Sequence, residues 1–214
     1  MMKVGTDGIL LGAWASIPLD CERILDIGTG TGLVALMLAQ RSNNTLIDAL
    51  DNNHSSYRLA AGNIINSPWD TRIDVLLKNI QRYAEKTALS YDLIVSNPPY
   101  FKTGVARNSA RHTTTLSHEE LLEAVLKLLT LKGHFCLILP IQEGTAFLDI
   151  ACINGLFPNK ITHVKPTLRK VPNRLLIDFT KEKRDVIEDE LVILGENGYS
   201  DEFIALTKDF YLKM

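Results

Sequence analysis

The segment ILDIGTGTG at Ile24–Gly32 runs directly into the apolar stretch LVALMLA at Leu33–Ala39. Its first four residues are typical of a short buried strand, and the stretch after the glycines has the spacing of a helix packed on a sheet. A strand that enters a helix through a glycine-rich turn lets the backbone approach a ligand closely. This stretch therefore predicts an α/β sheet that binds a nucleotide-like ligand at the carboxyl end of its first strand.

The phase of the glycines indicates which ligand. Gly28, Gly30 and Gly32 occupy the first, third and fifth places, and the sixth is Leu33. A dinucleotide fingerprint needs glycine at the first, third and sixth places, so hydride-transfer cofactors are disfavoured. Asp26, just inside the strand end, suits the cationic amino group of a ligand. S-adenosylmethionine, which carries an amino acid, fits this pattern better than a pyrophosphate.

Two more polar residues follow predicted strands. Asp51 ends the strand expected at 46–51, where a carboxylate can accept both hydroxyls of a ribose. A solvated aspartate at a strand end is the plain structural alternative, and Asp48 is a competing carboxylate in mid-strand. Asn79 follows the strand expected at 73–78 and can hydrogen-bond the edge of an adenine.

The tetrapeptide Asn97-Pro98-Pro99-Tyr100 comes directly after the apolar run at 91–96. The two prolines stop both sheet pairing and helix, which leaves a rigid corner at a strand end. This corner offers an amide side chain, the Pro98 carbonyl and the Tyr100 ring, which together can hold a planar molecule with an exocyclic amine. A simple strand stop with a surface tyrosine is the alternative, and the glycine motif favours the binding corner.

The chemistry expected at this corner is methylation of an amine. The lone pair of an exocyclic amine on an aromatic ring is delocalised into the ring, so the amine is a poor nucleophile. If the side-chain oxygen of Asn97 and the carbonyl of Pro98 accept its two hydrogens, the lone pair is localised toward the methyl donor. Tyr100 would stack on the planar ring and Phe101 would stiffen that wall. If the ring is a base within a nucleic acid, it must leave its stack to reach the corner. Asn97, Pro98 and Tyr100 are the predicted catalytic residues.

Together the two motifs resemble the class I S-adenosylmethionine-dependent methyltransferases of the Asn-Pro-Pro-Tyr, amino-methylating type. Segments at 2–15, 66–69, 110–112 and 199–212 make the chain similar, more closely, to the bacterial tRNA(Val) (adenine-N(6))-methyltransferase family. The resemblance implies a Rossmann-like fold with a seven-stranded, mainly parallel sheet, an antiparallel C-terminal hairpin and helices on both faces.

The same resemblance implies methylation of the exocyclic N(6) amine of an adenosine beside the anticodon of valine tRNA, with S-adenosylmethionine as cofactor. Its cofactor-binding residues would be Asp26, Gly28, Gly30, Gly32, Asp51, Asn79 and Asn97. Two other classes stay open. One is methylation of a different amine, in rRNA or in a protein glutamine side chain, and the other is an inactive module that binds RNA or the cofactor.

The chain departs from the family pattern at three places. The family usually has Glu where this chain has Asp51, and Asp where it has Asn79. Relatives also carry a basic and aromatic N-terminal segment before the motif KVGTD, which lies at 3–7 here. We expect that segment to be absent from this chain.

Basic residues predict where RNA binds. The net charge is only −2, but residues 160–184 hold eight basic and two acidic side chains. A basic hairpin beside the catalytic edge suits a phosphate backbone, and a solvated charge run is the alternative. The loop at 101–117 has basic residues and no acid, and we expect it to be a lid on the substrate. Arg111 is its best phosphate contact, and His112 is disfavoured as a general base because amine methylation needs none. The predicted substrate-binding residues are Tyr100, Phe101, Lys102, Arg107, Arg111, His112, Lys165, Arg169, Lys170 and Arg174.

Length and composition fit one domain over 1–214, since 214 residues with 46% hydrophobic content supply one α/β core. No apolar run approaches the roughly 18 residues of a membrane span, and the three cysteines are unclustered, so we expect a cytoplasmic protein with reduced thiols. No metal site and no obligate protein partner are expected. Asp7, ahead of an apolar stretch at 9–15 that would cover the cofactor, is a candidate helix N-cap. Strands are expected at 24–27, 46–51, 73–78, 92–96, 134–140, 160–165 and 174–180, with a further candidate at 190–194, and helices at 32–41, 54–66, 117–130, 142–153 and 201–209.

Overall fold

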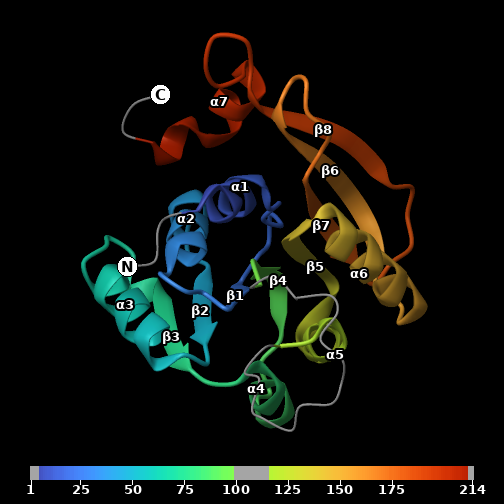
Figure 1. The fold of residues 1–214 in the computed structure, drawn as a ribbon. Helices are drawn as coiled ribbons and strands as arrows, with labels where there is room; N and C mark the ends of the chain where they lie inside the picture. Colours follow the sequence, from blue (N-terminus) through green and yellow to red (C-terminus); the bar gives the residue numbers. More distant parts are fainter. Residues whose placement is uncertain (1–4, 99–115, 212–214) are drawn as a thin grey trace, which may run out of the picture.

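An eight-stranded sheet organises the computed structural model, which describes residues 5–98 and 116–211 (Figure 1). The strand order is β3-β2-β1-β4-β5-β7-β6-β8, and the first five strands in this order run parallel. The strands are β1 (Arg23–Ile27), β2 (Leu46–Asp51), β3 (Ile73–Leu77), β4 (Tyr91–Ser96), β5 (Leu129–Pro140), β6 (Phe157–Thr167), β7 (Arg174–Thr180) and β8 (Ile187–Leu194).

Helices cover both faces of the sheet, because alternate side chains of each buried strand point to opposite faces. Ile24 packs in the core shared with α1, α2, α3 and α7, whereas its neighbour Leu25 packs in the core shared with α4, α5 and α6. The helices are α1 (Thr6–Trp14), α2 (Leu33–Arg41), α3 (His54–Ile65), α4 (Ile80–Lys86), α5 (His118–Leu128), α6 (Ile141–Ile153) and α7 (Asp201–Thr207), with 3-10 turns at Asp70–Arg72 and Lys208–Phe210.

The predicted fold class is confirmed, with two corrections. The sheet has eight strands and not seven, because the candidate strand at 190–194 forms from Ile187 and pairs parallel to β6. Three of its eight residues are acidic, most are exposed and only Leu191 is buried, so this edge strand has little of the alternation that reveals strands in a sequence. Strand β5 begins at Leu129 and not at 134, since Gly133 and polar neighbours interrupt its apolar pattern.

Two predicted caps have different outcomes. Ser117 and Glu120 form the capping box expected at the start of α5. Asp7 does not cap α1: Gly5 is the N-cap, and Asp7 lies in the first turn, where its Oδ2 accepts from Nε of Arg174 at 3.0 Å. The expectation failed because the partner of Asp7 is distant in sequence and only folding brings it near.

One edge of the sheet gathers most strand ends. β7 runs antiparallel to both β5 and β6, so β6 points the same way as β5, and β8 is parallel to β6. The carboxyl ends of every strand except β7 therefore share one edge, called the carboxyl edge below. Open α/β sheets bind ligands at this edge. Within the described residues, no helix is long and apolar enough to cross a membrane.

Candidate active site

The glycine turn after β1 has the predicted strand-turn-helix geometry. Gly28, Gly30 and Gly32 have φ values of 74°, 58° and 80°, in the left-handed region that costs other residues strain. The backbone N–H groups of Gly28 and Thr29 both donate to the carbonyl of Leu50, at 2.8 and 3.0 Å. These two bonds hold the turn over the end of β2.

Asp26 is a buried acid at the end of β1, only 1% exposed. The Thr29 hydroxyl donates to its Oδ2 at 2.6 Å. Burial raises the pKa of Asp26 to about 6, and the hydrogen bond from Thr29 partly opposes this shift. No cation within the described residues forms an ion pair with this carboxyl group. Asp26 is thus a desolvated acid that a cationic ligand would stabilise in its charged form.

Asp51 ends β2 and connects the surrounding turns. Its Oδ2 accepts from the N–H of Gly30 at 3.0 Å, and its Oδ1 accepts from the N–H of Asn53 at 2.8 Å. Each carboxylate oxygen can accept two hydrogen bonds, so both keep an acceptor position for a diol. The competing acid, Asp48, instead accepts from the buried Tyr91 hydroxyl at 2.6 Å and lies 3.4 Å from Nη1 of Arg23. Asp48 therefore belongs to the core.

Asn79 is the N-cap of α4. Its Oδ1 accepts from the N–H of Arg82 at 3.2 Å. Because the helix uses this oxygen, the polar group that Asn79 can offer an adenine edge is its Nδ2 donor. An aspartate at this position would have only acceptors to offer.

The ends of β4 and β1 are joined by a side chain. The Ser96 hydroxyl donates to the carbonyl of Ile27 at 3.0 Å, just before Asn97 and Pro98. Helix α1 lies against this corner, since a Cβ added to Gly8 would lie 3.9 Å from Nδ2 of Asn97. Pro99 and the predicted substrate residues Tyr100, Phe101, Lys102, Arg107, Arg111 and His112 lie outside the described residues.

A cavity of about 590 Å³ at the carboxyl edge brings these features together. Gly32 is the exception among the predicted cofactor residues: it does not line the cavity and packs on α3, where an added Cβ would lie 3.3 Å from Ile64. The predicted residues that line it are Asp26, Gly28, Gly30, Asp51, Asn79, Asn97 and Pro98.

Several lining residues were not predicted from the sequence. Gly5 and Gly8 place α1 against the cavity, and their spacing of three residues on a helix is the signal that was available. Gln81 and Lys78 follow the end of β3, and Nζ of Lys78 lies 5.0 Å from the centre of the Tyr83 ring. Glu120, from the capping box of α5, also lines it.

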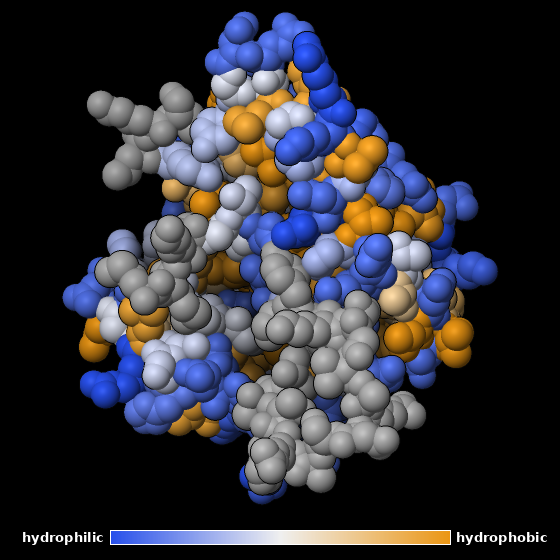
Figure 2. All heavy atoms as spheres, in the orientation of Figure 1, coloured by the Kyte–Doolittle hydropathy of each residue, from blue (hydrophilic) through white to orange (hydrophobic). Residues whose placement is uncertain are grey.

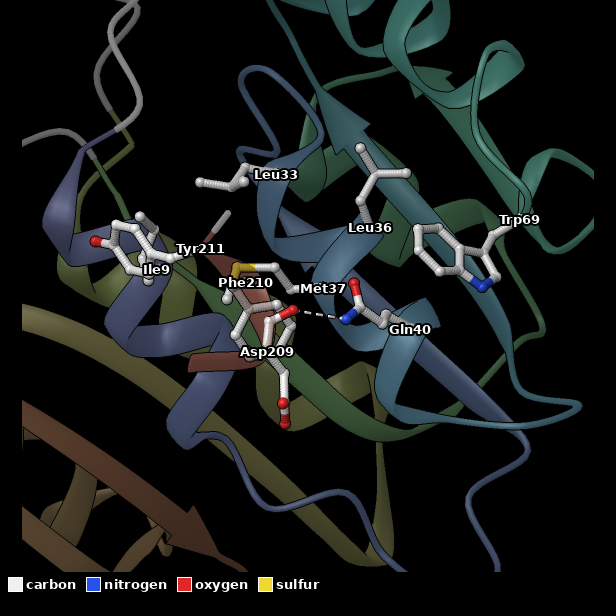
Figure 3. Close-up of a pocket in the computed structure, with 9 residues that line it drawn as sticks. All are labelled: Ile9, Leu33, Leu36, Met37, Gln40, Trp69, Asp209, Phe210 and Tyr211. Carbon is white, nitrogen blue, oxygen red and sulfur yellow. Dashed lines mark hydrogen bonds between the residues drawn. The ribbon is translucent and has the colours of Figure 1, made fainter. Parts of the chain in front are cut away.

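A second cavity of about 380 Å³ lies on the outer side of α2, and Leu33 lines both (Figure 3). Its walls are mostly apolar and aromatic, with Trp69 at one end of the row of α2 side chains in Figure 3. Its visible polar contact is internal, since Nε2 of Gln40 donates to the carbonyl of Asp209 at 3.0 Å. It holds neither the glycine turn nor strand-end carboxylates, so the larger cavity is the candidate active site.

Only some of the cations in the predicted basic hairpin are free of ion pairs within the described structure. Nζ of Lys165 lies 2.8 Å from Glu190 of β8, and Arg174 pairs with Asp7. Arg169 and Lys170, in the turn after β6, are exposed and have no ion pair within the described residues. The sequence could not show this division, because parallel pairing of β8 with β6 is what sets acids beside the lysines. In the described parts of the chain, no group of His, Cys, Asp and Glu is placed to hold a metal ion.

The fold and a family model together place this chain among the methyltransferases. The methyltransferase small domain family model matches residues 9–167, and the chain belongs to this family. A predicted O-methyltransferase from Agrobacterium tumefaciens shares the fold, with a TM-score of 0.74 at 19% identity over 95% of this chain and 96% of that one. TrmK from M. capricolum, solved with S-adenosyl-homocysteine, has a TM-score of 0.57 at 15% identity over 87% of this chain and 71% of that one.

Proteins with similar sequences identify the branch of the methyltransferase family to which this chain belongs. A Bacteroides fragilis protein is 47% identical over all of this chain and 92% of its own length, and a Salmonella typhi protein is 44% identical over all of this chain and 89% of its own. Both are named tRNA1(Val) (adenine(37)-N6)-methyltransferase. The chain therefore belongs to the tRNA1(Val) (adenine(37)-N6)-methyltransferase family, which confirms the resemblance drawn from its motifs.

Proposed function

We propose that this enzyme transfers a methyl group from S-adenosylmethionine to the N(6) amine of adenine 37 in tRNA1(Val). The observation that carries the proposal is the shared cavity: Asn97 and Pro98, at the end of β4, line the same space as Asp26 and the glycine turn at the end of β1. The names of the relatives supply the substrate.

The residues around the cavity suit S-adenosylmethionine. Asp26 would pair with the amino group of the methionine part, because this acid is buried and has no cationic partner in the described structure. Asp51 would accept from the ribose hydroxyls with the acceptor positions that Gly30 and Asn53 leave free. Asn79 would donate its Nδ2 hydrogen to a ring nitrogen of the adenine. The bound cofactor would supply an electrophilic methyl group on a sulfonium.

Asn97 and Pro98 would orient the amine that is methylated. The side-chain oxygen of Asn97 and the carbonyl of Pro98 would each accept one hydrogen of the amine, so that its lone pair points toward the cofactor side of the cavity. The hydrogen bond from Ser96 to Ile27 couples the two strand ends, so the acceptors and the glycine turn move little against each other. Such alignment needs no strong base.

The remaining predicted substrate residues are proposed to hold the RNA around the base. Tyr100 and Phe101 would stack on it, and Lys102, Arg107, Arg111 and His112 would contact neighbouring phosphates. Of the hairpin residues, Arg169 and Lys170 would meet RNA directly. Lys165 and Arg174 would act mainly through the ion pairs that shape this edge.

Methyl transfer to purified RNA tests the proposal. Labelled cofactor is incubated with enzyme and with tRNA1(Val) that lacks the modification, and N(6)-methyladenine at position 37 is the expected product. Asn97→Ala should lower the transfer rate by about a hundredfold or more while cofactor binding, measured by calorimetry, stays within a few fold.

The matched control is Asn154→Ala, an exposed asparagine at the end of α6 whose side chain donates to the Ile150 carbonyl of the same helix. This variant should transfer at the wild-type rate. Absence of transfer to tRNA by the wild-type enzyme would overturn the proposal, and transfer to rRNA or to a protein glutamine instead would favour one of the alternatives. Loss of cofactor binding in Asn97→Ala would show that Asn97 acts on the cofactor.

A further inference from the structure

Two turns lie side by side at the far end of the carboxyl edge. One joins β6 to β7 at residues 168–173, and the other joins β8 to α7 at residues 195–199. The last paired residues before the turns, Thr167 and Leu194, are opposite each other in the sheet. The second turn closes back on itself through a bridge between Leu194 and Tyr199. The pairing of β6 with β8 therefore places the starts of the two turns next to each other.

The two turns carry both cationic and exposed apolar side chains. Leu168 is 53% exposed, Val171 81% and Tyr199 43%. Arg169 and Lys170 stand between the two aliphatic side chains, exposed and without an ion pair in the described structure. We call Leu168, Arg169, Lys170, Val171 and Tyr199 the two-turn surface. Figure 2 shows mainly hydrophilic side chains at the top of the molecule, where these turns lie in Figure 1.

The aromatic member of the surface is held in place. The Tyr199 ring is stacked on Phe203 of α7, with centroids 4.9 Å apart and planes inclined by 28°, and it lies 6.3 Å from the Tyr211 ring. Phe203 is fully buried. A ring that is fixed from below and open to solvent loses little entropy when another planar group stacks on it.

A connection runs from this surface to the active site. Arg174, at the end of the first turn, pairs with Asp7 of α1, and the cavity is lined by Gly8 of α1 and by Gly5, its N-cap. The end of β6 lies three strands from the end of β4, a separation of roughly 14 Å at the usual strand spacing. One RNA molecule can therefore place a base at Asn97 and touch the two-turn surface with nucleotides outside the cavity.

We propose that the two-turn surface is a second contact site for the substrate RNA, separate from the catalytic cavity. Arg169 and Lys170 would bind backbone phosphates, and Tyr199 would stack on an unpaired base or a ribose. Glu196 lies in the second turn, and Asp201 and Glu202 begin α7, so the RNA approaches from the side of the first turn. This inference rests on the proposed function, because it takes tRNA as the substrate.

Charge reversal with a matched control tests the site. R169E/K170E changes the two free cations, and K183E/R184E makes the same charge change between β7 and β8, at the opposite edge of the sheet, where Arg184 pairs with Glu182. Binding of unmodified tRNA1(Val) is followed by fluorescence anisotropy at several salt concentrations. Cofactor binding and thermal unfolding are measured on each variant to establish that it is folded.

R169E/K170E should weaken tRNA binding about tenfold or more. It should also reduce the slope of log binding constant against log salt concentration by about one to two, since each phosphate contact contributes about 0.7 to 0.9 to this slope. KM for tRNA should rise while kcat and cofactor binding stay near wild type. Tyr199→Ala should weaken binding about fivefold or more, and Tyr199→Phe should restore it, because the ring face is kept. The control K183E/R184E should stay within twofold of wild type.

Wild-type tRNA affinity in R169E/K170E would overturn the inference, even if the enzyme methylates tRNA. An equal loss in K183E/R184E would also overturn it, because the effect would then be one of net charge. If the wild-type protein binds tRNA through this surface but transfers no methyl group, the proposed function fails and the contact site stands. Binding of a protein that R169E/K170E loses while tRNA binding is kept would assign the surface to a protein partner instead.

Discussion

Replacing Asp26 by Asn is expected to make the protein more stable and to cost it the methyl donor. Burial raises the pKa of Asp26 from its ordinary value of 3.8 to about 6. An acid with a raised pKa in the folded state binds its proton more tightly there, so it lowers stability as pH rises from 3.8 toward 6. At about 1.36 kcal/mol per pKa unit, the full penalty above pH 6 is about 3 kcal/mol.

Asparagine is neutral in both states and escapes this penalty. Its side-chain oxygen can still accept the hydrogen bond from Thr29, but its amide nitrogen places an N–H donor where the aspartate had an acceptor oxygen. We take this change to cost about 1 kcal/mol of stability. Asp26→Asn should therefore be more stable than wild type by about 2 kcal/mol at pH 7.5. Between pH 5 and pH 7.5 the advantage should grow by about 1.4 kcal/mol, because about one unit of that range lies below the pKa of Asp26.

The assay is urea unfolding of the cofactor-free protein, followed by circular dichroism at both pH values, together with calorimetric titration of S-adenosylmethionine. Thr29→Val should change stability in the opposite direction, because loss of the hydroxyl raises the pKa of Asp26 further. This variant should lower stability more at pH 7.5 than at pH 5. A stability difference between Asp26→Asn and wild type that is the same at both pH values would show that folding does not raise the pKa of Asp26. Unchanged cofactor affinity in Asp26→Asn would refute the assignment of the amino-group site.

Two further substitutions test the glycine turn and the cap of α4. Gly32→Ala should lower stability by about 1 to 3 kcal/mol, because φ is 80° there and an added Cβ meets Ile64 at 3.3 Å; a thermal unfolding temperature equal to that of wild type would contradict this. Asn79→Ala should cost about 1 kcal/mol of stability through the lost N-cap and should also weaken cofactor binding, whereas Asn79→Ser should recover the stability but not the cofactor binding. Calorimetry on both variants separates the two effects, and full cofactor affinity in Asn79→Ala would show that Asn79 does not contact the adenine.

Local pattern was a good guide wherever a segment is buried in the sheet. Strand β7 was predicted with its observed bounds, and β1 and β2 to within a residue, because burial on both faces makes most of their residues apolar. Strand β8 was only a candidate, since an exposed acidic edge strand is stabilised by its pairing with β6 and not by its own pattern. The early start of β5 was missed because Lys132 and Gly133 interrupt the apolar pattern of this strand.

The site divides in the same way. Short-range patterns were enough to predict the strand-turn-helix at Gly28–Gly32, the acids at the ends of β1 and β2, and the Asn97-Pro98 corner, because glycine and proline set backbone geometry within a few residues. Which charged side chains form ion pairs depends on contacts between distant parts of the folded chain. Asp7 and Arg174 are 167 residues apart in the chain, and Lys165 and Glu190 come from different strands, so folding alone joins them. Strand order and register place the turn that holds the exposed Arg169 and Lys170 next to the start of the turn that holds Tyr199.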